Sequence, residues 1–169
     1  AHARDRRIVG AVRQQQHAVV AAASRIGGQR GDERAADAGD RVDLMIREGV
    51  KVASFALAPK QELIARLKAA GSVVVPSVGA AKHARKVASW GADAVIVQGG
   101  EGGGHTGPVA TTLLLPSVLD AVDIPVVAAG GFFDGRGLAA ALSYGAAGVA
   151  MGTRFLLTSD STVPDAIKQ

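Results

Sequence analysis

Residues 91–107 read GADAVIVQGGEGGGHTG, and this stretch contains the clearest indication of the fold. The run from Ala94 to Gln98 is short and rich in β-branched residues, which is typical of a strand buried on both faces. Gly91 precedes it at a position where glycine commonly ends a helix. The nine residues after Gln98 include six glycines and no apolar side chain. The stretch therefore predicts a helix end, a buried strand and a long glycine-rich loop, in that order.

The same alternation of helix and strand extends over the chain from about residue 41. Strands are predicted over 52–57, 73–78, 94–98, 125–129 and 148–151, so their starts lie 21, 21, 31 and 23 residues apart. Helices are predicted over 60–70, 80–90, 113–122 and 135–144, with one more starting at residue 163. This spacing fits a parallel sheet with right-handed crossover helices, in either a closed barrel or an open doubly wound sheet.

Residues 1–40 differ in composition, with seven Arg, ten Ala, no Lys and no aromatic residue. Ala, Arg and Gln favour a short helix over residues 12–24, and Gly27 and Gly28 disfavour helix in the residues after it. We predict an irregular Arg/Ala-rich extension over 1–40 and a folded domain over 41–169. The functional alternative for the extension is an arginine-rich arm that binds nucleic acid or an anionic surface.

The overall composition excludes several classes of protein. The chain has 169 residues and no cysteine, which rules out disulfides, thiol catalysis, iron–sulfur clusters and cysteine-ligated zinc. Its apolar runs are shorter than the roughly 20 residues of a membrane span. A net charge of +4 and 4% aromatic residues give little basis for nucleic-acid binding. We expect a cytoplasmic protein with a small-molecule substrate and no metal, nucleic-acid or membrane partner.

Two glycine turns follow neighbouring predicted strands. Gly130 and Gly131 come after the strand at 125–129, and Gly152 and Thr153 come after the strand at 148–151. Glycine lets a backbone approach a ligand closely, and exposed N–H groups bind phosphate. Two adjacent glycine turns predict a phosphate site of the kind found at the carboxyl ends of barrel strands. The alternative is that turns between a strand and a helix contain glycine for structural reasons alone.

Five polar residues at the strand ends are candidates for function. His105 follows three glycines and is able to exchange a proton near neutral pH. The Gln98 amide ends a buried strand and needs a partner, either a ligand or a neighbouring backbone group. Glu101 is either a base or, more simply, a carboxylate that fixes the loop. Asp134 is expected to cap the next helix, and Arg154 either neutralises phosphate or pairs with an acid such as Asp160.

From about residue 42 to the end, the chain resembles the nitronate monooxygenase family, formerly called 2-nitropropane dioxygenases. These are FMN-dependent (β/α)8 TIM-barrel flavoproteins. The resemblance lies in four segments: GADAVIVQG at 91–99, GGHTG at 103–107, IPVVAAGG at 124–131 and MGTRF at 151–155. It implies an α/β fold of the parallel (β/α)8 barrel type, here incomplete, with about five βα units.

The resemblance also implies roles for individual residues. His105 matches the catalytic histidine of the family. Gln98 and Gly103 would contact the flavin, and its phosphate would be held by Gly130, Gly131, Ala150, Met151, Gly152 and Thr153. The implied reaction is the oxidation of an alkyl nitronate by O2 to a carbonyl compound and nitrite. Two alternatives remain: an FMN-dependent enoyl-acyl-carrier-protein reductase, which shares these motifs, and an inactive barrel fragment, since the family's first strand is not recognisable.

Overall fold

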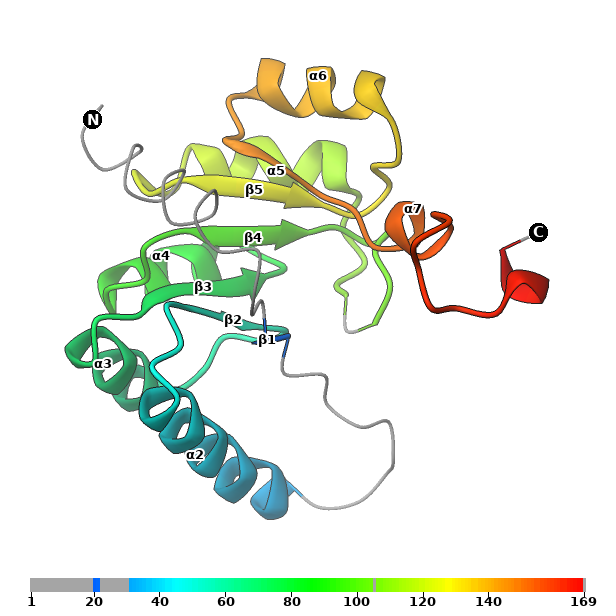
Figure 1. Cartoon of the computed structure of the whole chain (residues 1–169). Helices are drawn as coiled ribbons and strands as arrows, with labels where there is room; N and C mark the ends of the chain where they lie inside the picture. The colour runs from blue at the N-terminus through cyan, green and yellow to red at the C-terminus, as the bar shows by residue number, and fades with distance from the viewer. Residues whose placement is uncertain (1–19, 22–30, 105, 169) are drawn as a thin grey trace.

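The computed structural model describes residues 20–21, 31–104 and 106–168 (Figure 1). Six strands form one sheet in chain order, and every neighbouring pair is parallel. The strands are β1 (Val20–Ala21), β2 (Val52–Phe55), β3 (Val73–Val78), β4 (Val95–Gln98), β5 (Val126–Ala129) and β6 (Gly148–Ala150). A doubly wound sheet reverses its strand order at a switch point, whereas this order runs in one direction. The predicted parallel α/β fold of the barrel type is therefore confirmed.

Helices connect the strands in the expected alternation. They are α2 (Gly31–Arg47), α3 (Gln61–Ala69), α4 (Ala81–Ser89), α5 (Thr111–Leu119), α6 (Gly135–Tyr144) and the short α7 (Thr153–Leu156). The predicted bounds of β3 and α6 agree at both ends. α5 begins two residues before the predicted start and ends three before the predicted end. The helix expected from residue 163 is only a 3-10 turn, Asp165–Ile167, because none of its side chains is buried against the rest of the structure.

The N-terminal region differs from the prediction at two places. Val20 and Ala21 form β1, which pairs with β2 through Val20 and Ala53, so the helix predicted over 12–24 is wrong at these residues. α2 begins at Gly31, so residues 31–40 are helical and the boundary predicted at residue 40 falls inside a helix. That helix packs through Val42 and Met45, which lie beyond the composition change. The rest of the predicted extension lies outside the described residues.

The core lies between the sheet and its helices. Alternate strand residues, including Val74, Val97 and Ala128, are fully buried against Leu67 of α3 and Val118 of α5. Figure 1 shows α3 to α6 along the outer side of the curved sheet. Residues that point the other way are half-buried, among them Val75, Ile96 and Val127. The sheet therefore has one helix-covered face and one inner face, as barrel strands do.

The described strands do not close into a ring. Within the residues that the structure describes, β6 pairs only with β5 and β1 pairs only with β2. This arrangement agrees with the predicted incomplete barrel. In the same part of the chain, no helix combines the length and the apolar character needed to cross a membrane.

Leu67 gives a direct test of the core between α3 and the sheet. Its side chain is fully buried, so Leu67→Ala should lower the free energy of unfolding by about 2–5 kcal/mol. Leu113→Ala is the matched control, because Leu113 is 69% exposed and its loss should change stability by less than about 0.5 kcal/mol. Urea denaturation measures both, and equal losses would contradict this description of the core.

Candidate active site at the carboxyl edge of the sheet

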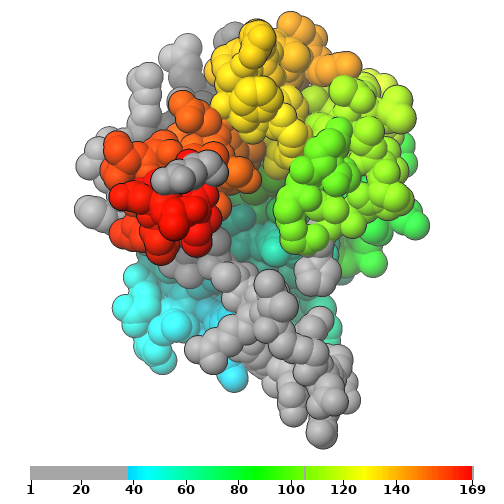
Figure 2. All heavy atoms as spheres, turned by 90° about the vertical axis from the view of Figure 1, so that its right-hand side faces the viewer, coloured from blue at the N-terminus to red at the C-terminus, as the bar shows by residue number. Residues whose placement is uncertain are grey.

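The parallel register brings the residues predicted to bind a cofactor to one edge of the sheet. Gln98, Ala129 and Ala150 are partners across β4, β5 and β6. The segments that follow them therefore leave the sheet side by side. They contain Gly103, the turn of Gly130 and Gly131, and the segment of Met151, Gly152 and Thr153. Figure 2 faces this edge, and the loop after β4 in green lies across a depression from the orange segment after β6.

The Gln98 amide is bound by the loop that follows it. Its Nε2 donates to the carbonyl oxygen of Gly103 at 2.6 Å, and the side chain is half-buried. Of the two partners considered for this amide, the neighbouring backbone is the one observed. The bond also ties the middle of the glycine loop to the end of β4.

Glu101 is held by the first residue of α5. Its carboxylate accepts from the Thr111 backbone N–H at 2.9 Å and from the Thr111 hydroxyl at 2.8 Å. The hydrogen bond from the Thr111 side chain is the main cause that lowers the pKa of Glu101 below its ordinary value of 4.5, and backbone hydrogen bonds add to it. A carboxylate with a lowered pKa is a poor proton acceptor at neutral pH. Glu101 thus fixes the loop, which was the simpler of its two expected roles.

Close packing at Gly99 and Gly130 joins the ends of β4 and β5 to α5. A Cβ at Gly99 would lie 2.1 Å from Oγ1 of Thr111 and 2.5 Å from its backbone nitrogen. Gly130 has a φ of +97°, and a Cβ there would lie 3.0 Å from the Gly102 nitrogen and 3.1 Å from Thr111 Oγ1. Sequence reasoning missed Thr111, which is buried and central to these contacts. Its only sequence signal is a hydroxyl residue near the start of a helix.

The other glycines of the edge leave room for a ligand. A Cβ at Gly103 or Gly152 would meet nothing within 4 Å, and Gly131 is exposed with a φ of +79°. Among the described residues, no acceptor takes the N–H groups of Gly131 and Gly152. Open backbone with free N–H donors on adjacent turns is suited to a phosphate. The open space and the unbonded N–H groups are thus compatible with the phosphate that the predicted flavin site requires.

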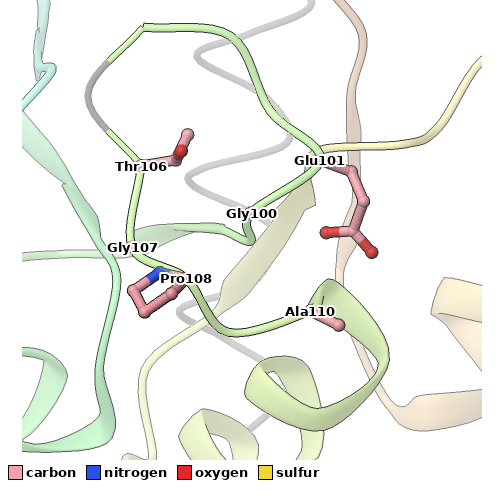
Figure 3. A pocket seen from close by; sticks show the side chains of 6 residues that line it. All are labelled: Gly100, Glu101, Thr106, Gly107, Pro108 and Ala110. Carbon is pink, nitrogen blue, oxygen red and sulfur yellow. The ribbon is translucent and has the colours of Figure 1, made fainter.

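A hollow of about 610 Å³ lies within the glycine loop (Figure 3). It is lined by Gly100, Glu101, Thr106, Gly107, Pro108 and Ala110. The loop reaches β3 at its far end, because the backbone of Gly107 lies against that of Gly79. The hollow is therefore bounded by the loop after β4, up to Ala110 at the start of α5.

The remaining predicted site residues have different outcomes. His105, the predicted catalytic residue, lies outside the described residues. Arg154 is exposed and, among the residues the structure describes, forms no ion pair, so its expected pairing with Asp160 is not observed. Asp134 caps α6 as predicted, accepting from the backbone N–H groups of Arg136 at 3.0 Å and Gly137 at 3.1 Å. The described residues contain no cluster of three or more potential metal ligands.

Comparison with known proteins identifies the family. The family model for nitronate monooxygenase matches residues 7–169. The chain belongs to the nitronate monooxygenase family. The match begins well before residue 42, where the sequence resemblance was placed, and thus includes both β1 and α2.

The proteins that the chain is similar to differ in their named activities. The chain is 88% identical over 138 residues to the (3aS,4S,5R,7aS)-5-hydroxy-7a-methyl-1-oxo-octahydro-1H-indene-4-carboxyl-CoA dehydrogenase of Mycobacterium tuberculosis, covering 80% of this chain and 39% of the relative. It is 38% identical to a probable nitronate monooxygenase of Staphylococcus aureus, covering 75% and 39%. The structure matches FabK from Thermotoga maritima with a TM-score of 0.74 and 45% identity, covering 77% and 42%. The chain thus spans about two fifths of the curated relatives it matches.

Gly99→Ala should be much more damaging than Gly103→Ala. A methyl group at Gly99 collides with the Thr111 backbone, which cannot move without displacing α5, whereas Gly103 has open space around it. We expect a lower thermal midpoint and loss of the Thr111 amide protection for Gly99→Ala only. Circular dichroism and amide hydrogen exchange measure both effects. Equal stability of the two variants would contradict the packing at Gly99.

The Glu101 carboxylate should make stability depend on pH on the acid side. Because its pKa is lower in the folded protein than the ordinary 4.5, its contribution is present above pH 4.5 and is lost as the pH falls through the folded value. The difference in thermal midpoint between the unaltered chain and Glu101→Gln should therefore shrink on acidification below pH 4.5. If the thermal midpoints of the two proteins change with pH in parallel, the Glu101 carboxylate does not stabilise the fold in this way.

Proposed function

We propose that the chain functions as part of an FMN-dependent oxidoreductase. The substrate that this enzyme dehydrogenates would be a bicyclic hydroxy-carboxyl-CoA thioester. The observation that carries this proposal is the 88% identity to a dehydrogenase named for such a substrate. The identity to a probable nitronate monooxygenase is less than half as large, at 38%. Substrate specificity commonly changes within a family whose cofactor site is retained, so the more similar relative is the better guide.

The residues at the carboxyl edge would hold FMN through its phosphate. The N–H groups of Gly131 and Gly152 are positioned on adjacent turns, and the Thr153 hydroxyl follows at once. The other predicted contacts, Gln98, Gly103, Gly130, Ala150 and Met151, lie at the same edge. When bound, FMN supplies the two-electron acceptor that dehydrogenation requires.

In dehydrogenation the acceptor takes a hydride equivalent and the second hydrogen leaves as a proton, which a base of the chain would accept. We assign this proton to His105, because an imidazole titrates near neutral pH and this residue follows the strand that ends at Gln98. Glu101 is unsuited to the task, since Thr111 occupies its carboxylate and its pKa is lowered. Arg154 is exposed next to the Gly152 turn and would neutralise a phosphate of the cofactor or of CoA.

Nitronate oxidation is the second candidate. It is favoured by the family match over residues 7–169 and by the relative from Staphylococcus aureus. In that reaction the same His105 would stabilise the negative charge of an alkyl nitronate, and O2 would accept the electrons. Both candidates use one cofactor site, so they differ in substrate and final electron acceptor.

The test uses the full chain mixed with FMN and then desalted. Under anaerobic conditions, the hydroxy-carboxyl-CoA thioester should bleach the visible flavin absorbance, because the substrate transfers two electrons. His105→Ala should retain the flavin but bleach about a hundredfold more slowly, the usual effect of losing a general acid or base.

The other results of this flavin reduction test distinguish the alternative functions. A flavin-loaded chain that the thioester does not bleach would exclude the dehydrogenase proposal. Oxygen consumption with propyl nitronate under air would then favour the second candidate, and oxidation of NADH with an enoyl thioester would favour the reductase alternative. A chain that retains no FMN after desalting would support the inactive barrel fragment.

A further inference from the structure

Glu101 contacts two other segments of the carboxyl edge at once. Its carboxylate accepts two hydrogen bonds from Thr111, at 2.8 and 2.9 Å. Its Cβ and Cγ lie 3.4 and 3.7 Å from the point that a Cβ on Gly131 would occupy. The aliphatic part of the side chain therefore lies close to the turn after β5, within contact distance of the place where a side chain on Gly131 would begin, while the charged part is bound at the start of α5.

Thr111 completes the connection from the other side. The residue is only 4% exposed, and its Oγ1 lies 3.1 Å from the carbonyl oxygen of Gly130. The same hydroxyl thus touches both the glycine loop, through Glu101, and the Gly130–Gly131 turn. The hydroxyl has a single proton, which the Glu101 and Gly130 oxygens share, and no buried polar side-chain atom in the described part of the chain lacks a partner.

The charged carboxylate of Glu101 accepts hydrogen bonds from neutral groups and, within the described structure, does not form an ion pair. Among the described residues, no lysine or arginine pairs with it. Its partners are neutral N–H and O–H groups of one residue, and a hydrogen bond to a charged group is stronger than one between neutral groups. An exposed carboxylate bound in this way acts as an anchor for the loop that carries it.

We propose that Glu101 is a positioning residue that holds the Gly130–Gly131 turn in place by fixing the glycine loop to Thr111. The turn is the one assigned to the FMN phosphate, so the consequence for FMN rests on the proposed function. The mechanical coupling between loop and turn does not depend on that function, and it can be measured separately.

The first experiment measures the mobility of the turn in the full chain by ¹⁵N relaxation. In the unaltered chain the amides of Gly102 and Gly131 should have order parameters near 0.85, and Glu101→Ala should bring both below about 0.6. Glu101→Gln should restore most of the rigidity, because one amide oxygen can accept both bonds from Thr111 and the stem against Gly131 is kept. Likewise, Thr111→Ser should behave like the unaltered chain and Thr111→Val should not.

Two control variants separate positioning from general stability. Glu62→Ala removes an exposed carboxylate from α3 and should leave Gly131 rigid. Val118→Ala opens a cavity under α5 and lowers stability without touching the loop. If Glu101→Ala leaves Gly131 as rigid as Glu62→Ala does, or if Val118→Ala mobilises Gly131 equally, the proposal is overturned.

The second experiment titrates FMN into the same variants and follows quenching of flavin fluorescence. Glu101→Ala should weaken binding about tenfold or more, the ratio expected for losing a hydrogen bond to a charged group, and Glu101→Gln should weaken it much less. Failure of the unaltered chain to bind FMN would count against the proposed function alone. The order parameters of Gly131 would still decide the role of Glu101.

Discussion

The absence of a side chain at Gly99 allows α5 to begin directly against the end of β4. Any Cβ at this position would overlap the Thr111 backbone and hydroxyl. Because α5 starts close to the end of β4, the two ends of the loop that connects them lie near each other. The Gly100 N–H donates to the Val109 carbonyl oxygen at 2.8 Å and joins these two ends. The glycine content of this loop therefore reflects tight packing at its ends as well as conformational freedom.

Glycines at this edge fall into two groups with different physical reasons. Gly99 and Gly130 lack side chains because protein atoms fill the space that a Cβ would need. Gly103 and Gly152 have no neighbour within 4 Å of that position, so the protein alone does not explain why they are glycine. Their open backbone would allow a ligand to approach closely. The contrast assigns the first group to the framework of the edge and leaves the backbone of the second group accessible to a ligand.

Local sequence pattern was sufficient for most of the fold. The predicted bounds of α6 agree with the structure because its end signals are local: Asp134 caps its first turn, and Gly145, with a φ of +103°, follows its last residue. β1 was missed because a strand of two residues is defined by its pairing with β2 rather than by its own pattern. Thr111 was missed for a similar reason, since its partners Glu101 and Gly130 are 10 and 19 residues away. Contacts of that range become visible only once the parallel register is known.

The geometry of the candidate site depends on fewer strands than the barrel does. Its assigned residues follow β4, β5 and β6, which are hydrogen-bonded neighbours, and the Glu101 and Thr111 contacts lie among these same segments. Closure of a barrel is thus not required to bring the glycine turns together. The inner face of the sheet is different, because Val75, Ile96 and Val127 are only half-buried in the described structure. Apolar residues on that face gain stability when they are covered, so a segment that covers the inner face would also stabilise the strands that carry the candidate site.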